Sequence, residues 1–483
     1  MNEKSGAQIS QKAFVQSLVI LLIFMIFAGT LTRVIPAGKF ARIEVDGREI
    51  VQPDSFAFTD RADYPIWRWF TAPMEVLGGE DSLTIIVIIL FLLMVGAAFA
   101  VLDKSGILQA ALSNVVKKYG DQKYTLLLVI SFFFMALGAF FGIFEEVVPL
   151  VPIMIALSYS LGWDTLTGLG MSILATNMGF SAAITNPFTI GVAQKLAGLP
   201  LFSGAWFRII IFIVMYAILA IFLTRYAKKI EKDPKASPVY EEDLKSKSQY
   251  DNFQLDNLAT DNPNLKKAIR WIVIFIVLIL TTLFTAPFVE IISFAALPLV
   301  GILFLFGGMG AGFLSGTEKK TVWAAAKEGA LGIAPAIPLI LMASSIKYII
   351  AQGGVIDTML FKLANVFTQT SPILAALLVY VLALVIEIFI ASGSAKAFLI
   401  IPILLPLADL VDVTRQVAVT AYCFGDGFSN LAYPTNPVLL IVLGLTVVTY
   451  GKWMKWLLKL WIWVFAATVI FLGIGVMIGY GPF

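Results

Sequence analysis

The chain has 483 residues, of which 59% are hydrophobic and 13% charged, and its mean hydropathy is +0.90. A soluble domain is usually about half apolar and a quarter charged, so this composition predicts a membrane protein. One cysteine and no histidine exclude a disulfide scaffold and a His or Cys metal site, and the net charge of +3 gives no indication of nucleic-acid binding.

Apolar runs of about 20 residues, long enough to cross a hydrocarbon core of about 30 Å, recur along the chain. The first run follows a polar leader, and no small-residue cleavage site comes after it. We therefore interpret it as a retained membrane helix rather than a signal peptide. The predicted full spans are residues 13–34, 82–102, 206–226, 268–287, 290–312, 331–350 and 456–480.

Four stretches do not fit simple spans. Residues 124–161 and 372–410 carry glycine, proline or charged residues near their centres, which predicts re-entrant helical hairpins. Polar backbone at membrane depth is tolerated where it faces protein or a watery cavity. Residues 163–198 and 412–450 are interrupted by polar loops, which predicts two discontinuous helices, each made of two half-helices.

These unusual segments recur in one order. The sequence Thr-Asn-Pro at residues 185–187 returns at residues 435–437, and Gly-Phe-Ser at 179–181 returns at 427–429. An amphipathic segment precedes each hairpin, at 107–116 and at 355–367, and both segments are predicted to lie in the membrane interface. One extra helix between the halves reverses the direction of the second half. The sequence therefore predicts two inverted-topology repeats within an all-α polytopic membrane protein.

The basic residues orient this arrangement. Most of the 34 Lys and Arg fall on the cytoplasmic side if the N-terminus is cytoplasmic. The outer stretch 35–80 contains several aromatic residues and predicts an interfacial helix, with a lid over the transport path as the weaker alternative. The predicted organisation is a first repeat at 1–227, a cytoplasmic linker of low order at 228–267, a connecting helix at 268–288 and a second repeat at 289–483.

Each discontinuous helix carries an Asn-Pro pair in its polar loop. Asn186 and Asn436 are suited to cap a helix N-terminus, and Pro187 and Pro437 suit a first turn, where the missing N–H is not needed. Two helix starts at mid-membrane would direct their positive dipole ends at a shared cavity, which favours a carboxylate. The weaker alternative is a kinked helix closed by packing.

The sequence of residues 141–199, which begins FGIFEEVVPLVP and includes TNMGFSAAITNP, resembles the YfcC-type carriers of the ion-transporter superfamily. The similarity extends over nearly the whole chain. That family is linked with anaerobic C4-dicarboxylate carriers and with proteins described as basic amino-acid antiporters, including arginine/ornithine exchangers. The resemblance implies a multi-pass protein of the bacterial plasma (inner) membrane and a homodimer.

More distantly, the paired loops are similar to the Ser-Asn-Thr signatures of sodium-coupled dicarboxylate carriers. Those proteins bind substrate carboxylate and sodium at two hairpin tips and work by an elevator motion. The matching positions in this chain read Thr-Asn-Pro at 185–187 and at 435–437. The serine of the signature is absent, so the resemblance does not imply the sodium sites.

Ionisable residues at predicted membrane depth are a second indication of a site, because each costs about 2.5 kcal/mol or more unless it faces water or a partner. Glu145 and Glu146 fall at the first hairpin tip, and Asp426 falls in the second polar loop. Lys396 is the repeat equivalent of Glu146 (146 + 250 = 396). Acids beside two helix starts suit a substrate that carries both a carboxylate and a positive group.

Other interpretations remain open. In one, Glu146 pairs with Lys396 and Glu387 pairs with Lys347 as structural ion pairs. In another, one of the acids carries a proton. A passive channel would need a continuous polar stripe. An intramembrane enzyme finds no support, because the sequence has no histidine, no metal-ligand cluster and no recognisable serine-base spacing.

The sequence thus predicts a secondary active transporter with alternating access of the elevator type. The favoured activity is basic amino-acid exchange of the arginine/ornithine type, and the alternative is a sodium- or proton-coupled C4-dicarboxylate carrier. The expected partners are a small solute and the lipid bilayer, with no nucleic acid and no cofactor; a coupling sodium or proton and any metal site are left open. The predicted binding residues are Glu145, Glu146, Ser181, Thr185, Asn186, Pro187, Asp426, Ser429, Thr435, Asn436 and Pro437, with Asn177, Lys396 and Asn430 as secondary candidates.

Overall fold

The computed structural model describes residues 11–45, 48–52, 55–61, 63–251, 262–285, 289–364 and 370–481. Parts of several predicted segments lie outside them: 46–47, 53–54 and 62 of the outer stretch, 252–261 of the linker, 286–288 of the connecting helix and 365–367 of the second interfacial segment. Within the described residues, eight helices are long and apolar enough to cross a membrane: Phe14–Val34, Ser82–Lys104, Lys117–Phe141, Ala205–Lys232, Ala295–Leu314, Lys319–Gln352, Gly393–Leu410 and Tyr450–Met477. The predicted multi-pass helical fold is confirmed.

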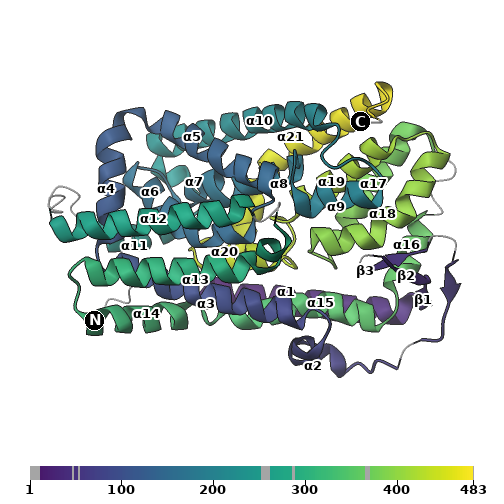
Figure 1. Cartoon of the computed structure of the whole chain (residues 1–483), viewed down its shortest axis with the longest axis horizontal. Helices are drawn as coiled ribbons and strands as arrows, with labels where there is room; N and C mark the ends of the chain where they lie inside the picture. Colours follow the sequence, from purple (N-terminus) through teal and green to yellow (C-terminus); the bar gives the residue numbers. More distant parts are fainter. Residues whose placement is uncertain are drawn as a thin grey trace.

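The long helices lie roughly along the long axis of the molecule (Figure 1). Helices α1, α3, α14 and α15 follow one side, where α1 packs on α15 and α3 packs on both α13 and α14. Helices α10 and α21 pack together on the opposite side. The bounds are α1 Gln11–Val34, α3 Ser82–Lys104, α10 Ala205–Lys232, α12 Pro263–Thr285, α13 Glu290–Leu314, α14 Lys319–Ile333, α15 Ala336–Gln352 and α21 Tyr450–Met477.

Short α-helices fill the space between these two sides. Several of them are joined by 3-10 or π-helical segments, which are labelled η. The first group is α4 Ile107–Tyr119, η3 Gly120–Gln122, α5 Lys123–Ala136, η4 Leu137–Phe141, η5 Glu145–Leu150, α6 Val151–Ser160, α7 Thr165–Leu169, η6 Gly170–Leu174, α8 Ala175–Ala182, η7 Pro187–Gly191 and α9 Val192–Leu196. The second group is α16 Ile356–Ala364, α17 Pro372–Glu387, α18 Gly393–Leu410, α19 Arg415–Ser429 and α20 Pro437–Gly444. The predicted interfacial segments correspond to α4 and α16.

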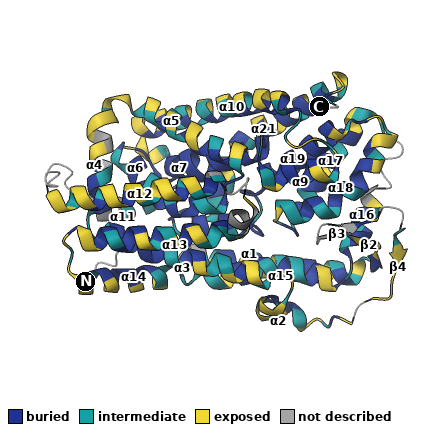
Figure 2. Ribbon diagram, viewed as in Figure 1, coloured by how far each residue is buried: buried dark blue, intermediate teal, exposed yellow. Residues whose placement is uncertain are grey.

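The interior and the surface are both apolar. Every residue of α8 is buried, and so is every residue of α19 after its first, whereas the outer helices show many exposed positions (Figure 2). Ile213, Phe306 and Trp463 are each exposed over more than half of their surface. Such side chains are favourable on the outside only where lipid is the solvent, which agrees with the predicted bilayer environment.

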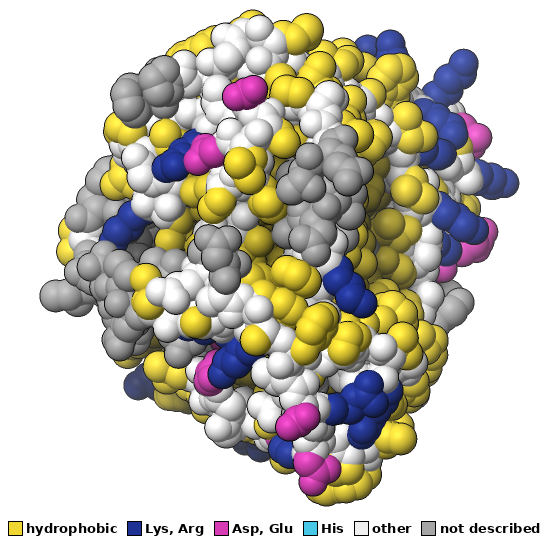
Figure 3. All heavy atoms as spheres, turned by 90° about the vertical axis from the view of Figure 1, so that its right-hand side faces the viewer, with side chains coloured by type: hydrophobic (Ala, Val, Ile, Leu, Met, Phe, Trp, Pro, Cys, Tyr) yellow, Lys and Arg dark blue, Asp and Glu magenta, His cyan; other side chains and the backbone are white. Residues whose placement is uncertain are grey.

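The outer stretch departs from the all-helical expectation, because it contains four short strands. Strands β1 Gly38–Lys39 and β4 Ala57–Phe58 pair antiparallel, as do β2 Arg42–Val45 and β3 Arg48–Val51. They gather at the end of the molecule that also holds the C-terminus, away from α4 and α11 (Figure 1). Seen from this end, charged side chains are scattered among a largely hydrophobic surface (Figure 3).

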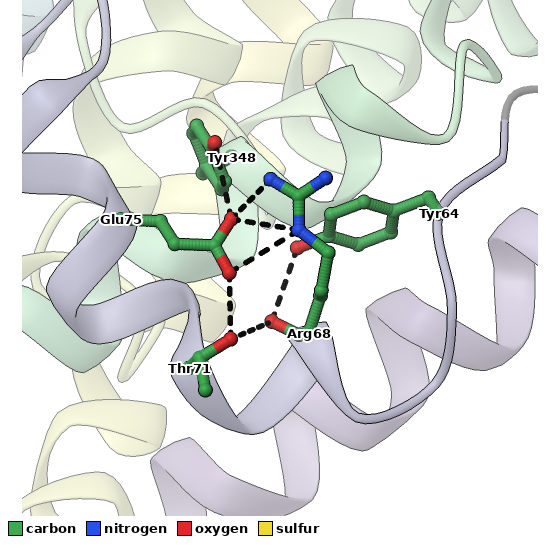
Figure 4. Close-up of polar contacts among 5 residues, drawn as sticks. All are labelled: Tyr64, Arg68, Thr71, Glu75 and Tyr348. Carbon is green, nitrogen blue, oxygen red and sulfur yellow. Dashed lines mark hydrogen bonds and ion pairs between the residues drawn. The ribbon is translucent and has the colours of Figure 1, made fainter.

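The predicted aromatic helix in this outer stretch is α2 Arg68–Glu75, which continues into η2 Val76–Gly78. Its polar side chains attach it to α15 (Figure 4). The Arg68 guanidinium lies 2.5 Å from a Glu75 oxygen, and the Tyr348 hydroxyl donates to the same carboxylate at 3.3 Å. The hydrogen bond from Arg68 holds the pKa of Glu75 below its usual value.

The expected low order of the linker 228–267 is wrong for its described part. Helix α10 continues to Lys232, η8 Pro234–Ala236 and α11 Tyr240–Asp251 follow, and α12 begins at Pro263. Asp243 explains the order, because it is buried and accepts hydrogen bonds from the Thr165 N–H at 3.0 Å and from the Tyr159 hydroxyl at 2.9 Å. The polar composition of the linker does not reveal that Tyr159 and Thr165, far earlier in the sequence, donate these hydrogen bonds.

Candidate substrate-binding site

The first polar loop is a break between helices. Helix α8 ends at Ala182, and Ala183 adopts a left-handed conformation with φ of 46°. The helix resumes at Pro187, where the Asn186 side-chain oxygen accepts a hydrogen bond from the Phe188 N–H at 2.9 Å. The predicted Asn-Pro cap is therefore present, and the first turn of the helix that it caps lies at the break.

The second polar loop repeats this geometry. Helix α19 ends at Ser429 and α20 begins at Pro437. The Asn436 side-chain oxygen accepts from the Val438 N–H at 3.0 Å, and its amide nitrogen donates to the Asn430 side-chain oxygen at 2.9 Å. Asn430, a secondary candidate, thus orients the cap of the second half-helix.

The first hairpin tip lies directly against the first break. The Thr185 N–H donates to the Ala139 carbonyl at 3.1 Å, and the Thr185 hydroxyl donates to the Phe140 carbonyl at 2.9 Å. Gly142, with φ of 68°, turns the chain at the tip, and a Cβ there would lie 2.2 Å from the Asn186 side-chain oxygen. Only glycine fits this position, because both the backbone angle and the contact exclude a side chain.

The two breaks are brought together where α8 and α19 pack on each other. A Cβ on Gly427 would lie 2.5 Å from both the Cα and the Oγ of Ser181. Elements of the two halves of the chain also contact each other, since η5 touches α20 and α18 touches η7 and α9. Residues that are far apart in the sequence therefore converge on one central region.

A buried ion triad occupies the second half of this region. The Lys396 ammonium lies 2.8 Å from an Asp426 oxygen and also pairs with Glu387, and all three side chains are at most 1% exposed. Lys347 instead pairs with Asp81 at 2.5 Å. The alternative pairings of Lys396 with Glu146 and of Lys347 with Glu387 are therefore wrong. Two positions related by a sequence offset need not be neighbours in space, which is why the offset of 250 did not predict this pairing.

Glu145 and Glu146 have a different environment. Both are partly exposed at the start of η5, and the Phe144 N–H donates to a Glu146 oxygen at 3.1 Å. No Lys or Arg of the described residues forms an ion pair with either carboxylate. The structure therefore places two carboxyl groups without a basic partner among the described residues beside the first break.

The remaining predicted polar residues divide into two groups. The Ser181 hydroxyl donates to the Asn177 carbonyl at 2.7 Å, and the Ser429 hydroxyl donates to the Gly425 carbonyl at 2.6 Å, so both donors are used within their own helices. The Asn177 side-chain oxygen and the Thr435 hydroxyl are buried, and neither has a hydrogen-bond partner among the described residues. An unpaired buried polar atom is costly unless a ligand or water satisfies it.

Sequence analysis missed Arg208 and Trp453. Arg208 is wholly buried and donates to the Ile184 carbonyl of the first break, and the Trp453 indole donates to the Leu431 carbonyl of the second. The signal for Arg208 was a charged residue just inside the predicted span 206–226. Among the described residues, no group of three or more His, Cys, Asp or Glu could hold a metal ion.

This arrangement of apolar spans around two interrupted helices defines a multi-pass membrane protein. Residues 14–477 match the model of the DcuC family, described as C4-dicarboxylate anaerobic carrier. The chain belongs to this family of transporters. The predicted relationship to YfcC-type carriers is confirmed.

A relative found by its sequence agrees with this assignment. The chain is 30% identical over 478 residues to the Escherichia coli (strain K12) protein named "Putative basic amino acid antiporter YfcC", covering 92% of each chain. Two transporter structures are similar at a TM-score of 0.44. The Alcanivorax borkumensis YdaH transporter is 17% identical, with 97% of this chain and 100% of that chain covered; Neisseria gonorrhoeae MtrF, described with a class of antimetabolite efflux pumps, is 16% identical, with 94% of each covered.

Proposed function

We propose that this chain is a secondary active transporter that exchanges a basic amino acid across the membrane, in the manner of arginine/ornithine antiport. The observation that carries the proposal is the pair Glu145 and Glu146, which has no basic partner among the described residues and lies at the tip touching the first break. Asp426, which we expected to meet a positive group as well, is instead held by Lys396.

The charges of the central region favour a cationic substrate. The central region contains the four acids Glu145, Glu146, Glu387 and Asp426 and the two bases Lys396 and Arg208, so its formal charge is 2 − 4 = −2. A basic amino acid carries a net positive charge and reduces this surplus, whereas a dicarboxylate increases it. In a site of low dielectric constant, such differences amount to several kcal/mol.

The substrate's carboxylate has a separate place in the proposal. Asn186-Pro187 and Asn436-Pro437 begin half-helices whose unpaired N–H groups favour an anion, and the Thr435 hydroxyl is an unsatisfied donor beside the second. A substrate with both charges would place its carboxylate at a break and its side-chain cation near the Glu145 carboxylate.

A second candidate is a C4-dicarboxylate carrier coupled to sodium or a proton. The presence of two separate helix starts favours it, because each could bind one carboxylate. Coupling cations would then have to neutralise Glu145 and Glu146 before a dianion entered. The basic amino acid remains the better fit, because it needs no such compensation.

The proposed transport mechanism is an elevator motion of two inverted repeats. The hairpins and broken helices pack on each other through α8, α19, α18 and η5, whereas α3, α12, α13 and α14 pack mainly on one another and α3 also contacts η5. The hairpins and broken helices would move relative to α3, α12, α13 and α14 and carry the substrate with them. We further propose a homodimer in a bacterial inner membrane with a cytoplasmic N-terminus.

Counterflow in proteoliposomes tests the function. Vesicles loaded with arginine, ornithine or succinate would be assayed for uptake of the same labelled compound, with and without sodium. Arginine and ornithine should exchange for each other, and Glu145→Gln with Glu146→Gln should lower arginine exchange at least tenfold. The exposed acid variant Glu80→Gln is the matched control and should exchange normally. Exchange of succinate without arginine would show that the proposal is wrong.

A further inference from the structure

Arg208 is a buried guanidinium whose partners are all neutral. Its side chain lies in α10 and is 0% exposed. Nε and Nη2 both donate to the Ile184 carbonyl, at 3.2 and 3.0 Å, and the other contacts are to the Phe202 and Ser203 carbonyls and the Tyr480 hydroxyl. No carboxylate of the described residues pairs with it, so its positive charge is not cancelled locally.

The contact falls on the first break. Ile184 is the second residue after the end of α8 and directly precedes Thr185, whose backbone leads to the cap at Asn186. Arg208 therefore fixes the position of this turn from behind and adds a full positive charge to the dipole of the helix that begins there. In a region of low dielectric constant, the electrostatic effect of the Arg208 charge extends beyond the residues that it contacts.

At the second break, an uncharged side chain makes the equivalent contact. Helices α10 and α21 each have 28 residues, and Arg208 and Trp453 are both the fourth residue (208 + 245 = 453). The Trp453 indole donates at 2.7 Å to the carbonyl of Leu431, which is again the second residue after its helix end. The two breaks are thus held alike, but the residue that makes the contact is cationic at the first break and neutral at the second.

We propose that Arg208 is a positioning residue that makes the first break the carboxylate-binding end of the substrate site. This inference rests on the proposed function and adds a direction to it, since two helix starts alone do not say which receives the carboxylate. The side-chain cation of the substrate then extends from the first break toward Glu145, Glu146 and the facing half-helix α20. A purely structural role, in which Arg208 only satisfies the carbonyls at the end of α8, predicts no such direction.

Competition by a pair of ligands separates the two roles. Agmatine has the guanidinium chain of arginine but no carboxylate, so the ratio of the two inhibition constants reports on carboxylate binding alone. Wild-type protein should prefer arginine at least tenfold. Arg208→Met should lower this preference below about threefold and leave agmatine affinity within about threefold. Equal weakening of both ligands would overturn the proposal.

Two further variants keep the test decisive if Arg208→Met does not fold. Arg208→Lys keeps the charge, and Tyr480→Phe keeps the guanidinium but removes one hydrogen bond; both should retain the preference for arginine. Folded protein of either variant that lost the preference would overturn the proposal. Trp453→Phe is the matched neutral contact and should weaken both ligands by the same factor.

Failure of this inference can be distinguished from failure of the proposed function. If wild-type vesicles exchange succinate and not arginine, the proposed function fails. The same variants are then compared with succinate against succinamate, which lacks one carboxylate. Arg208→Met should again reduce the preference for the ligand with the additional carboxylate, and an unchanged preference would reject the role of Arg208.

Discussion

Ser181 and Gly427 touch where the helices leading into the two breaks cross. A Cβ on Gly427 would lie 2.5 Å from the Cα of Ser181, a contact with backbone that no rotamer change can relieve. The absence of a side chain at Gly427 therefore sets how closely α8 and α19 approach. Since both breaks follow this crossing, its spacing also determines the shape of the site between them.

Gly427→Ala should therefore impair both stability and transport. Overpacking of this kind typically costs 1 to 3 kcal/mol, so we expect a clear fall in the thermal unfolding midpoint in detergent and loss of exchange. Gly473→Ala in α21 is the control, because a Cβ there meets nothing within 4 Å. That variant should be neutral or slightly stabilising. Wild-type activity in Gly427→Ala would mean that the crossing tolerates a wider spacing.

The buried triad predicts an unequal response to removal of its members. Lys396→Met leaves Glu387 and Asp426 without a counter-charge, which should lower the free energy of unfolding by about 3 to 5 kcal/mol. Glu387→Gln should cost less, because Lys396 keeps its contact with Asp426. Thermal unfolding measures both.

The matched control for the triad is the exposed pair of Lys347 with Asp81, whose side chains are 31% and 52% exposed. Lys347→Met should change the free energy of unfolding by no more than about 1 kcal/mol. A larger effect for Glu387→Gln than for Lys396→Met would argue that Lys396 is neutral in the protein.

An Asn-Pro pair begins three helices, and the third provides a control for the two in the site. Asn262 accepts from the Asn264 N–H at 3.0 Å at the start of α12, outside the central region. Asn186→Asp should keep the cap oxygen, but its charge should repel a carboxylate and raise the KM for arginine at least tenfold. Asn262→Asp should leave KM unchanged.

Alanine at the same positions tests the cap itself. Asn186→Ala and Asn262→Ala should each destabilise by about 1 kcal/mol, because each removes an acceptor from a helix start. Only Asn186→Ala should also reduce transport. If Asn186→Asp transports arginine with an unchanged KM, the carboxylate does not bind at the first break.

Docking of α11 should depend on pH. Burial, and to a smaller extent the charge of Asp164, raises the pKa of Asp243 from 3.8 to about 6, against the opposing hydrogen bonds from Thr165 and Tyr159. A docked state with the higher pKa binds the proton more tightly. Docking is therefore strongest below about pH 4, weakens by about 3 kcal/mol as the pH rises to about 6, and is constant above that.

Hydrogen exchange of residues 240–251 checks this prediction, after correction for intrinsic rates. The free energy of opening should be larger at pH 5 than at pH 7 in wild-type protein. Asp243→Asn has no titrating group at this position and should lose that difference. The same difference in Asp243→Asn would show that Asp243 is not the group responsible.

Much of the fold and part of the site could be predicted because their signals are local. A run of about 20 apolar residues specifies a span by its length, and an Asn-Pro pair specifies a helix start within three residues. The caps at Asn186 and Asn436 and the turns beside them follow from such short segments. The short strands in the outer stretch were missed, because two to four residues carry too little pattern.

Only the tertiary structure decided which charges meet. Lys396 pairs with Asp426 rather than Glu146, Arg208 reaches the first break, and Asp243 orders a segment of linker composition against Thr165, 78 residues away. An ion pair depends on the convergence of separate helices in three dimensions, and neither spacing nor repeat symmetry records that convergence. The sequence by itself thus determined most of the spans and the helix starts, whereas packing determined which acids form ion pairs.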